Sequence, residues 1–135
     1  MALTDKIYKN AKIQIETNTN GDITTSDGEC LVKQVTGGTE IFYKPAEGVS
    51  CTVLFGTKRS QITMRGEISY KLNIEPGARA PAVLRTSEGN IDVTVLGGDM
   101  LVKPFAGGFE AVLQYKLFNG GALFSDITVA ARIRY

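Results

Sequence analysis

The stretch from Ile68 to Glu75 reads Ile-Ser-Tyr-Lys-Leu-Asn-Ile-Glu and alternates larger apolar or aromatic side chains with polar ones. Side chains of a β-strand point alternately to opposite faces, so this alternation predicts a strand with one dry and one wet face. Pro76-Gly77 follows and ends the strand. The same period of two recurs along the chain, and no long segment shows a helical period. The sequence therefore predicts an all-β protein.

Outward from this segment, short alternating runs are separated by turn residues such as Asn20-Gly21, Gly37-Gly38 and Asn119-Gly120-Gly121. We expect Gly97-Gly98-Asp99 to close a hairpin and residues 78–81 to form a loose link. The expected strands cover residues 8–17, 23–35, 39–46, 49–55, 59–65, 68–75, 82–86, 91–95, 100–105, 109–118 and 123–135.

These strands predict a single antiparallel up-and-down β-barrel of about eight to ten strands. A long sheet with one apolar face must either stack on a second sheet or curl until its first and last strands meet, because open edges invite aggregation. The 15 glycines suit the bulges and sharply twisted corners of a small barrel. No linker interrupts the pattern, so residues 1–135 are expected to form one domain.

Composition excludes more chemistry than it suggests. The formal net charge is +1, so no global field favours nucleic acid or an anionic membrane. The absence of histidine removes the usual proton shuttle and every imidazole metal site. Cys30 and Cys51 form no CxxC motif and are interpreted as two reduced thiols. The start, residues 1–9, lacks the apolar core of a signal peptide, and a cytoplasmic location is expected.

Five ordered segments resemble the YwiB-like family of uncharacterised bacterial proteins, over about Tyr8 to Arg134. They are Glu40-Ile41-Phe42-Tyr43, Ile62-Thr63-Met64-Arg65-Gly66, Leu72-Asn73-Ile74-Glu75-Pro76-Gly77, Arg85-Thr86-Ser87-Glu88-Gly89-Asn90-Ile91 and the run from Gly107 to Leu117. The resemblance implies a calycin-like, lipocalin-like barrel in a cytoplasmic protein with no established activity. The chain departs from the family where Leu84 or Arg85 replaces a frequent tyrosine. It has no tryptophan for the lipocalin Gly-x-Trp signature, so lipocalin ligands are not implied.

The barrel lumen is the first candidate site, since a barrel of this size either fills its interior with side chains or holds one small ligand. Tyrosine hydroxyls on inward faces offer polar groups that orient a mostly apolar guest. For each position the alternative is a packed core. The candidate lining residues are Tyr43, Phe55, Met64, Tyr70, Leu72, Val93, Leu113 and Tyr115.

Arginines form the second candidate, because guanidinium groups that converge at a barrel rim bind carboxylate or phosphate. The residues are Arg65, Arg85 and Arg132. The alternative is that they are ordinary exposed charges paired across the sheet. Convergence of two of them decides between these readings.

Other classes of function have less support. A stripe of lysines with Phe42 and Phe118 raises a nucleic-acid alternative, which the near-neutral charge counts against, so no nucleic-acid or membrane partner is expected. No nucleophile has a visible base, and no phosphate, dinucleotide or metal motif is present. We therefore expect neither an enzyme nor a cofactor.

Two hypotheses remain for function. The chain either binds a small, mostly apolar ligand in the lumen, or acts as a protein-interaction or structural module, for instance a homodimer, through exposed apolar surface. The second hypothesis directs attention to apolar residues on the wetter faces, namely Val35, Phe42, Leu54, Leu96, Leu101, Phe118 and Phe124.

Overall fold

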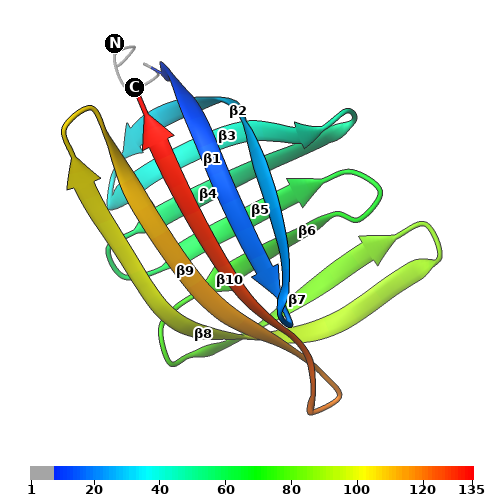
Figure 1. Cartoon of the computed structure of the whole chain (residues 1–135). Coiled ribbons are helices and arrows are strands. Elements are labelled where there is room, and N and C mark those ends of the chain that lie inside the picture. Colours follow the sequence, from blue (N-terminus) through cyan, green and yellow to red (C-terminus); the bar gives the residue numbers. More distant parts are fainter. Residues whose placement is uncertain (1–7) are drawn as a thin grey trace, which may run out of the picture.

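The computed structural model describes residues 8–135, which form ten strands and no helix (Figure 1). Most of residues 1–9, from which a cytoplasmic location is expected, lie outside these residues. The strands are β1 (Lys9–Thr19), β2 (Asp22–Val35), β3 (Gly38–Ala46), β4 (Val49–Gly56), β5 (Ser60–Arg65), β6 (Tyr70–Ile74), β7 (Arg79–Thr86), β8 (Gly89–Phe105), β9 (Gly108–Asn119) and β10 (Ala122–Arg134).

All ten strands join one antiparallel sheet in the order β6-β5-β4-β3-β2-β1-β10-β9-β8-β7. Strands that are neighbours in sequence pair with each other, except β6 and β7, and the first strand also pairs with the last, from Lys12 opposite Arg134 to Thr19 opposite Ile127. The expected up-and-down barrel is therefore confirmed, in a nearly closed form. The ends of the sheet, β6 and β7, face each other across a seam.

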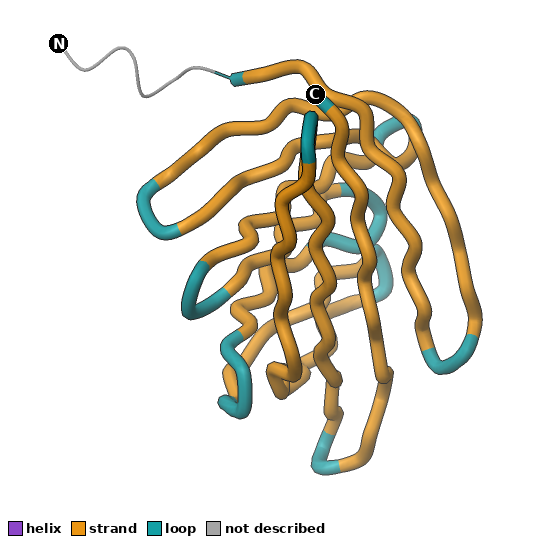
Figure 2. Tube along the Cα trace, turned by 60° about the vertical axis from the view of Figure 1, so that its left-hand side comes forward, coloured by secondary structure: helices purple, strands orange, loops and turns teal. Residues whose placement is uncertain are grey.

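The turns that separate these strands are short, as the tube in Figure 2 shows. In the β1–β2 hairpin, Thr19 pairs with Asp22 across the two residues Asn20 and Gly21, whose φ angles are 55° and 95°. Asparagine and glycine tolerate this left-handed conformation, and the resulting turn matches the natural twist of the strands. The turn expected at Asn20-Gly21 is confirmed. Residues 8–135 contain no helix that is long and apolar enough to cross a membrane.

Two long strands turn the corners of the barrel. The first half of β2 pairs only with β1, whereas residues 30–35 also pair with β3. In the same way, residues 89–96 of β8 pair with β7, and its second half pairs with β9 alone. β1, β9 and β10 thus form a layer with parts of β2 and β8, and Figure 1 shows this layer crossing in front of β3–β6.

A short contact closes the seam between β6 and β7 at one end, and at the other end Gly97 of β8 bonds to the connection that joins these two strands. At one end, the Ser69 and Arg85 backbones exchange two N–H···O=C bonds of 2.9 Å. At the other end, the Gly97 backbone N–H donates to Ala78 O over 3.0 Å, and Gly97 O accepts from the Gly77 N–H over 2.9 Å. Between these contacts β6 and β7 form no ladder.

Three expectations for local structure are wrong. Residues 79–81, expected in a loose link, form the start of β7 and pair with β8. Gly97-Gly98-Asp99 does not close a hairpin, because β8 runs through it with a register shift between Gly97 and Met100. Glycine pairs suit a bulge as well as a turn, so the composition alone did not separate the two. Ile68 lies before β6 rather than on its dry face, and half of its surface is exposed (50%).

Candidate functional site

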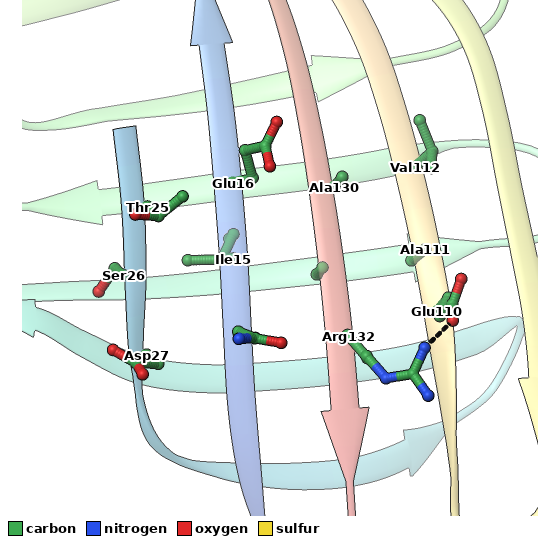
Figure 3. A pocket seen from close by; sticks show the side chains of 12 residues that line it. Ile15, Glu16, Thr25, Ser26, Asp27, Glu110, Ala111, Val112, Ala130 and Arg132 are labelled. Atoms are coloured by element: carbon green, nitrogen blue, oxygen red, sulfur yellow. Dashed lines mark hydrogen bonds and ion pairs between the residues drawn. The ribbon is translucent and has the colours of Figure 1, made fainter. Parts of the chain in front are cut away.

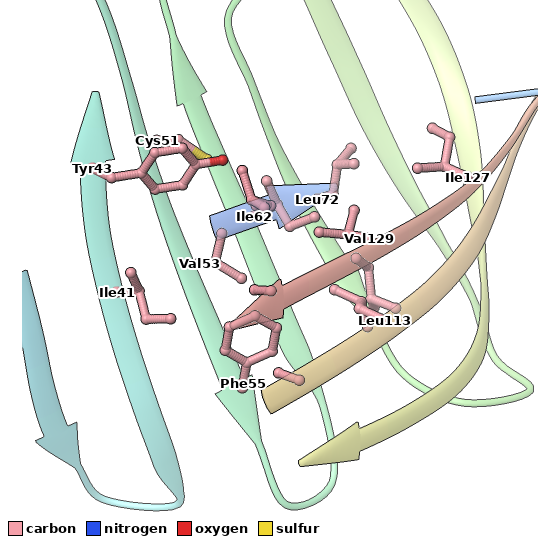
Figure 4. Packing of buried hydrophobic residues seen from close by; sticks show 14 of the residues in the cluster. Ile41, Tyr43, Cys51, Val53, Phe55, Ile62, Leu72, Leu113, Ile127 and Val129 are labelled. Atoms are coloured by element: carbon pink, nitrogen blue, oxygen red, sulfur yellow. The ribbon is translucent and has the colours of Figure 1, made fainter. Parts of the chain in front are cut away.

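The predicted lumen residues all belong to the interior or its margin. Tyr43, Phe55, Leu72, Val93, Leu113 and Tyr115 are buried in one hydrophobic cluster, part of which Figure 4 shows. Phe55 meets Phe109 edge to face, with ring centroids 6.5 Å apart. At these positions the interior is a packed core. Met64 and Tyr70 are only partly buried and pack against the cluster from its edge.

A row of sulfur and phenol groups crosses the inner face of the barrel. Register places Cys30 opposite Tyr43, Tyr43 opposite Cys51, Cys51 opposite Met64, and Met64 opposite Tyr70. The row runs from β2 to β6 and ends at the seam. Tyr70 is therefore the end of the row that lies nearest to solvent.

Burial keeps these groups neutral. Desolvation raises the pKa of Cys30 to about 11 and that of Tyr70 to about 12. It also raises the pKa values of Tyr43, Cys51 and Tyr115, and negative charge on Cys51 or Tyr70 would raise the pKa of Tyr43 further. At neutral pH the row thus offers hydroxyl and thiol donors without a charge.

Cys30 and Cys51 are both buried and free. They flank Tyr43 on the two neighbouring strands, so two strand spacings, about 10 Å, separate their backbones. A disulfide needs Cα atoms within about 7 Å. The architecture therefore keeps the two thiols apart, and the phenol of Tyr43 lies beside the Cys51 thiol (Figure 4).

A surface pocket of about 460 Å³ opens at the seam beside Tyr70. Strands β5 and β6 supply one side of it, Ser69 lies at the closing contact, and β7 supplies the other side. We call it the seam pocket. It is lined by Thr63, Met64, Arg65, Ser69, Tyr70, Lys71, Val83 and Arg85.

Strand parity gives the seam pocket an apolar floor and a cationic rim. Met64 and Tyr70 pair across β5 and β6 with their side chains turned toward the core, and they form the floor. Arg65, Lys71 and Arg85 are exposed residues around it. No carboxylate lines the pocket, so its cations have no acidic partner within its walls.

Within residues 8–135, the rim cations also form no ion pair elsewhere. In the part of the chain that the structure describes, the ion pair found joins Arg132 and Glu110. Arg65, Lys71 and Arg85 therefore present unneutralised charge to solvent at one place, in a molecule whose formal net charge is only +1. This arrangement attracts an anion, and two guanidinium groups are suited to hold a carboxylate or phosphate.

The structure brings together Arg65 and Arg85 but not Arg132, so the expected trio of arginines needs correction. Arg132 lies on the outer face of β10, where it pairs with Glu110 (Figure 3) and its guanidinium carbon lies 4.4 Å from the Phe105 ring centroid. Strand order explains the difference: β10 is next to β9 and β1, on the side of the barrel away from the seam.

The surface around Arg132 is a second hollow of the molecule, with two adjoining pockets of about 480 and 610 Å³. Its charges are mixed: Lys12, Arg132 and Arg134 lie among Glu16, Asp27, Glu29 and Glu110. One cross-strand row places Asp27, Gln14, Arg132, Glu110 and Lys103 side by side. Neighbouring opposite charges of this kind stabilise a sheet surface and leave little net attraction for an ion.

The sequence analysis missed four residues of the seam pocket. Lys71 was read as one residue of the wet face, and Thr63, Ser69 and Val83 were not singled out as site residues. The strand register could have pointed to two of these residues, because Thr63 pairs with Lys71 on the outer face of β5 and β6. The approach of Val83 and Arg85 depends on barrel closure, which joins segments that are not neighbours in sequence.

No group of three or more His, Cys, Asp or Glu residues within residues 8–135 is arranged to hold a metal ion. The polar groups around the seam pocket are cations, a threonine, a serine and a phenol. This set of donors suits an anionic guest and provides no oxygen cage for a cation.

Comparison with known proteins yields a match of fold. No protein-family model matches this sequence, and no curated protein matches it. The crystal structure of the ywiB protein from Bacillus subtilis superposes with a TM-score of 0.79, covering 98% of this chain and 98% of that one, at 9% sequence identity. This likeness supports the barrel architecture expected from the resemblance. At such low identity it shows the fold alone.

Proposed function

We propose that this barrel is a binding protein for a small amphiphilic anion, held at the seam pocket. The observation that carries the proposal is the convergence of Arg65, Lys71 and Arg85 on a pocket without a carboxylate. The anionic group of the ligand binds to this rim. Its apolar part contacts Val83 and the half-buried side chains of Met64 and Tyr70.

The ligand class follows from both parts of the site. A bare inorganic anion would gain nothing from the apolar floor, and an uncharged apolar molecule would gain nothing from the rim. A monocarboxylate or monophosphate with a short hydrocarbon or aromatic part uses both. The tightly packed interior holds the ligand at the seam rather than in the centre of the barrel.

The proposal includes binding without catalysis, in the cytoplasm. The pocket contains no carboxylate, and the chain contains no histidine, so a general base at neutral pH is missing from it. Tyr70, whose pKa burial raises to about 12, is a hydrogen-bond donor there rather than a base. Two free buried thiols suit a reducing compartment.

Decanoate is a suitable probe of the seam pocket. Decanol, which lacks the charge, and acetate, which lacks the apolar chain, are the comparison ligands. In isothermal titration calorimetry we expect decanoate to bind more tightly than decanol or acetate, and we expect its affinity to fall as the salt concentration is raised. Arg65→Gln and Arg85→Gln should each weaken decanoate binding by about tenfold, because each removes a charge-assisted hydrogen bond.

Arg59→Gln is the matched control, since Arg59 is exposed and lies outside the seam pocket. It should leave the affinity for decanoate unchanged. The proposal is overturned if decanoate and decanol bind equally well. Equal affinities of the Arg65→Gln, Arg85→Gln and Arg59→Gln variants for decanoate would also overturn it.

A further inference from the structure

The second half of β8 is a free edge of the sheet. Residues 100–105 pair with β9, from Met100 opposite Leu113 to Phe105 opposite Gly108. On the other side of β8, β7 pairs only with residues 89–96. Within residues 8–135, no strand pairs with the far side of residues 100–105. We call this segment the β8 edge.

The β8 edge exposes apolar surface on both faces. Leu101, opposite Val112 on the outer face, is 61% exposed. Val102 is opposite the buried Ala111, and so belongs to the inner face, yet it is 40% exposed. An inward valine is open to this degree because no further strand covers it. Both faces at this edge thus lack a neighbour.

Backbone geometry limits which groups the edge offers. Phe105 and Gly108 close a two-residue turn, and residue pairs next to such turns exchange both hydrogen bonds. Alternation then directs the N–H and C=O of Leu101 and Lys103 toward β9. The N–H and C=O of Met100 and Val102 point to the free side. Pro104, which has no N–H, ends the ladder there.

From this geometry we propose that the β8 edge pairs with the same edge of a second copy of the chain, as a two-fold antiparallel dimer centred on Leu101. Met100 and Val102 then exchange backbone hydrogen bonds with the partner's Val102 and the partner's Met100. In this register Asp99 lies opposite the partner's Lys103, and Lys103 opposite the partner's Asp99. The edge is therefore complementary to itself in hydrogen bonding and in charge.

The other free edge of the same layer differs in this respect. The first half of β2 is also unpaired on its far side, but it carries Asp22, Asp27 and Glu29 and no cation. Two copies of that edge would repel each other. The charges of the two edges therefore favour pairing of the β8 edge, rather than the β2 edge, with a second copy of the chain.

A charge-reversal cycle on the full chain tests the dimer by sedimentation equilibrium. Asp99→Lys and Lys103→Asp each place like charges opposite each other twice, and each should weaken the dimer by about tenfold. The double variant carrying both changes restores opposite charges and should regain most of the lost affinity. Lys58→Asp, in the exposed turn between β4 and β5, is the control and should leave the dimer unchanged.

Amide hydrogen exchange provides a second measurement on the unchanged protein. Protection of the Met100 and Val102 amides should rise with protein concentration, because these groups are bonded only in the dimer. A chain that stays monomeric up to millimolar concentration overturns the proposal. The proposal is also overturned if the chain forms assemblies that grow without limit, or if it forms a dimer whose affinity the charge-reversal variants leave unchanged. These outcomes are independent of decanoate binding at the seam.

Discussion

Tyr70 belongs to two environments. Its register partner is Met64, and through Met64 it continues the inner row that contains Cys51, Tyr43 and Cys30. It also lines the seam pocket. Period-two alternation correctly predicted that Tyr70 points inward. Its position at the pocket could not be predicted, because that depends on which strand lies beyond β6.

The same burial predicts how stability responds to alkaline pH. The pKa of Cys30 rises from 9.0 in a free chain to about 11, and that of Tyr70 rises from 10.0 to about 12. Below pH 9 these groups are protonated in both states, so their contribution to stability is complete. Between pH 9 and 12 the unfolded chain releases protons that the folded chain retains, and the free energy of unfolding falls.

Urea denaturation at a series of pH values measures this effect. Each group contributes at most about 1.4 kcal/mol per pH unit, and Tyr70→Phe should remove one such contribution. The variant should therefore lose less stability than the natural chain between pH 10 and 12. Tyr135→Phe, at an exposed position, is the control. Parallel profiles for Tyr70→Phe and the natural chain would show that Tyr70 is not buried as described.

Among the elements, β8 is the strand whose course the sequence pattern predicts only in part. Alternation located its two halves, 91–95 and 100–105, yet the glycines between them form a bulge instead of a turn. The bulge carries the strand from one layer into the other. Gly97 is required there because the backbone of Glu75 packs directly against it: an added Cβ would lie 2.0 Å from Glu75 O.

Gly97→Ala should therefore destabilise the barrel. The backbone of β8 or of the β6–β7 connection would have to move, at a cost of about 1–3 kcal/mol typical of overpacking. Gly28→Ala is the matched control, since an added Cβ at Gly28 meets nothing within 4 Å. Urea denaturation of both variants gives the comparison. Equal stabilities of the two variants would contradict the close approach at Gly97.

At the scale of the whole molecule, the all-β class, the single barrel and the pairing of first and last strands all follow from alternation and turn chemistry. The location of the seam does not, since nothing in the sequence of β6 or β7 marks them as the ends of the sheet. The candidate site was accordingly predicted in part. Arg65 and Arg85 were identified by residue type, whereas the structure separates Arg132 from them and adds Lys71.

The most direct measurement is a backbone chemical-shift map recorded while decanoate is added to the isotope-labelled chain. We expect the shifted amides to cluster on both sides of the seam, around Arg65, Tyr70, Lys71, Val83 and Arg85. The amides around Arg132, on the opposite side of the barrel, should stay in place and serve as the internal reference. Shifts centred on Arg132, shifts spread through the core, or no shifts at all would contradict a binding site at the seam.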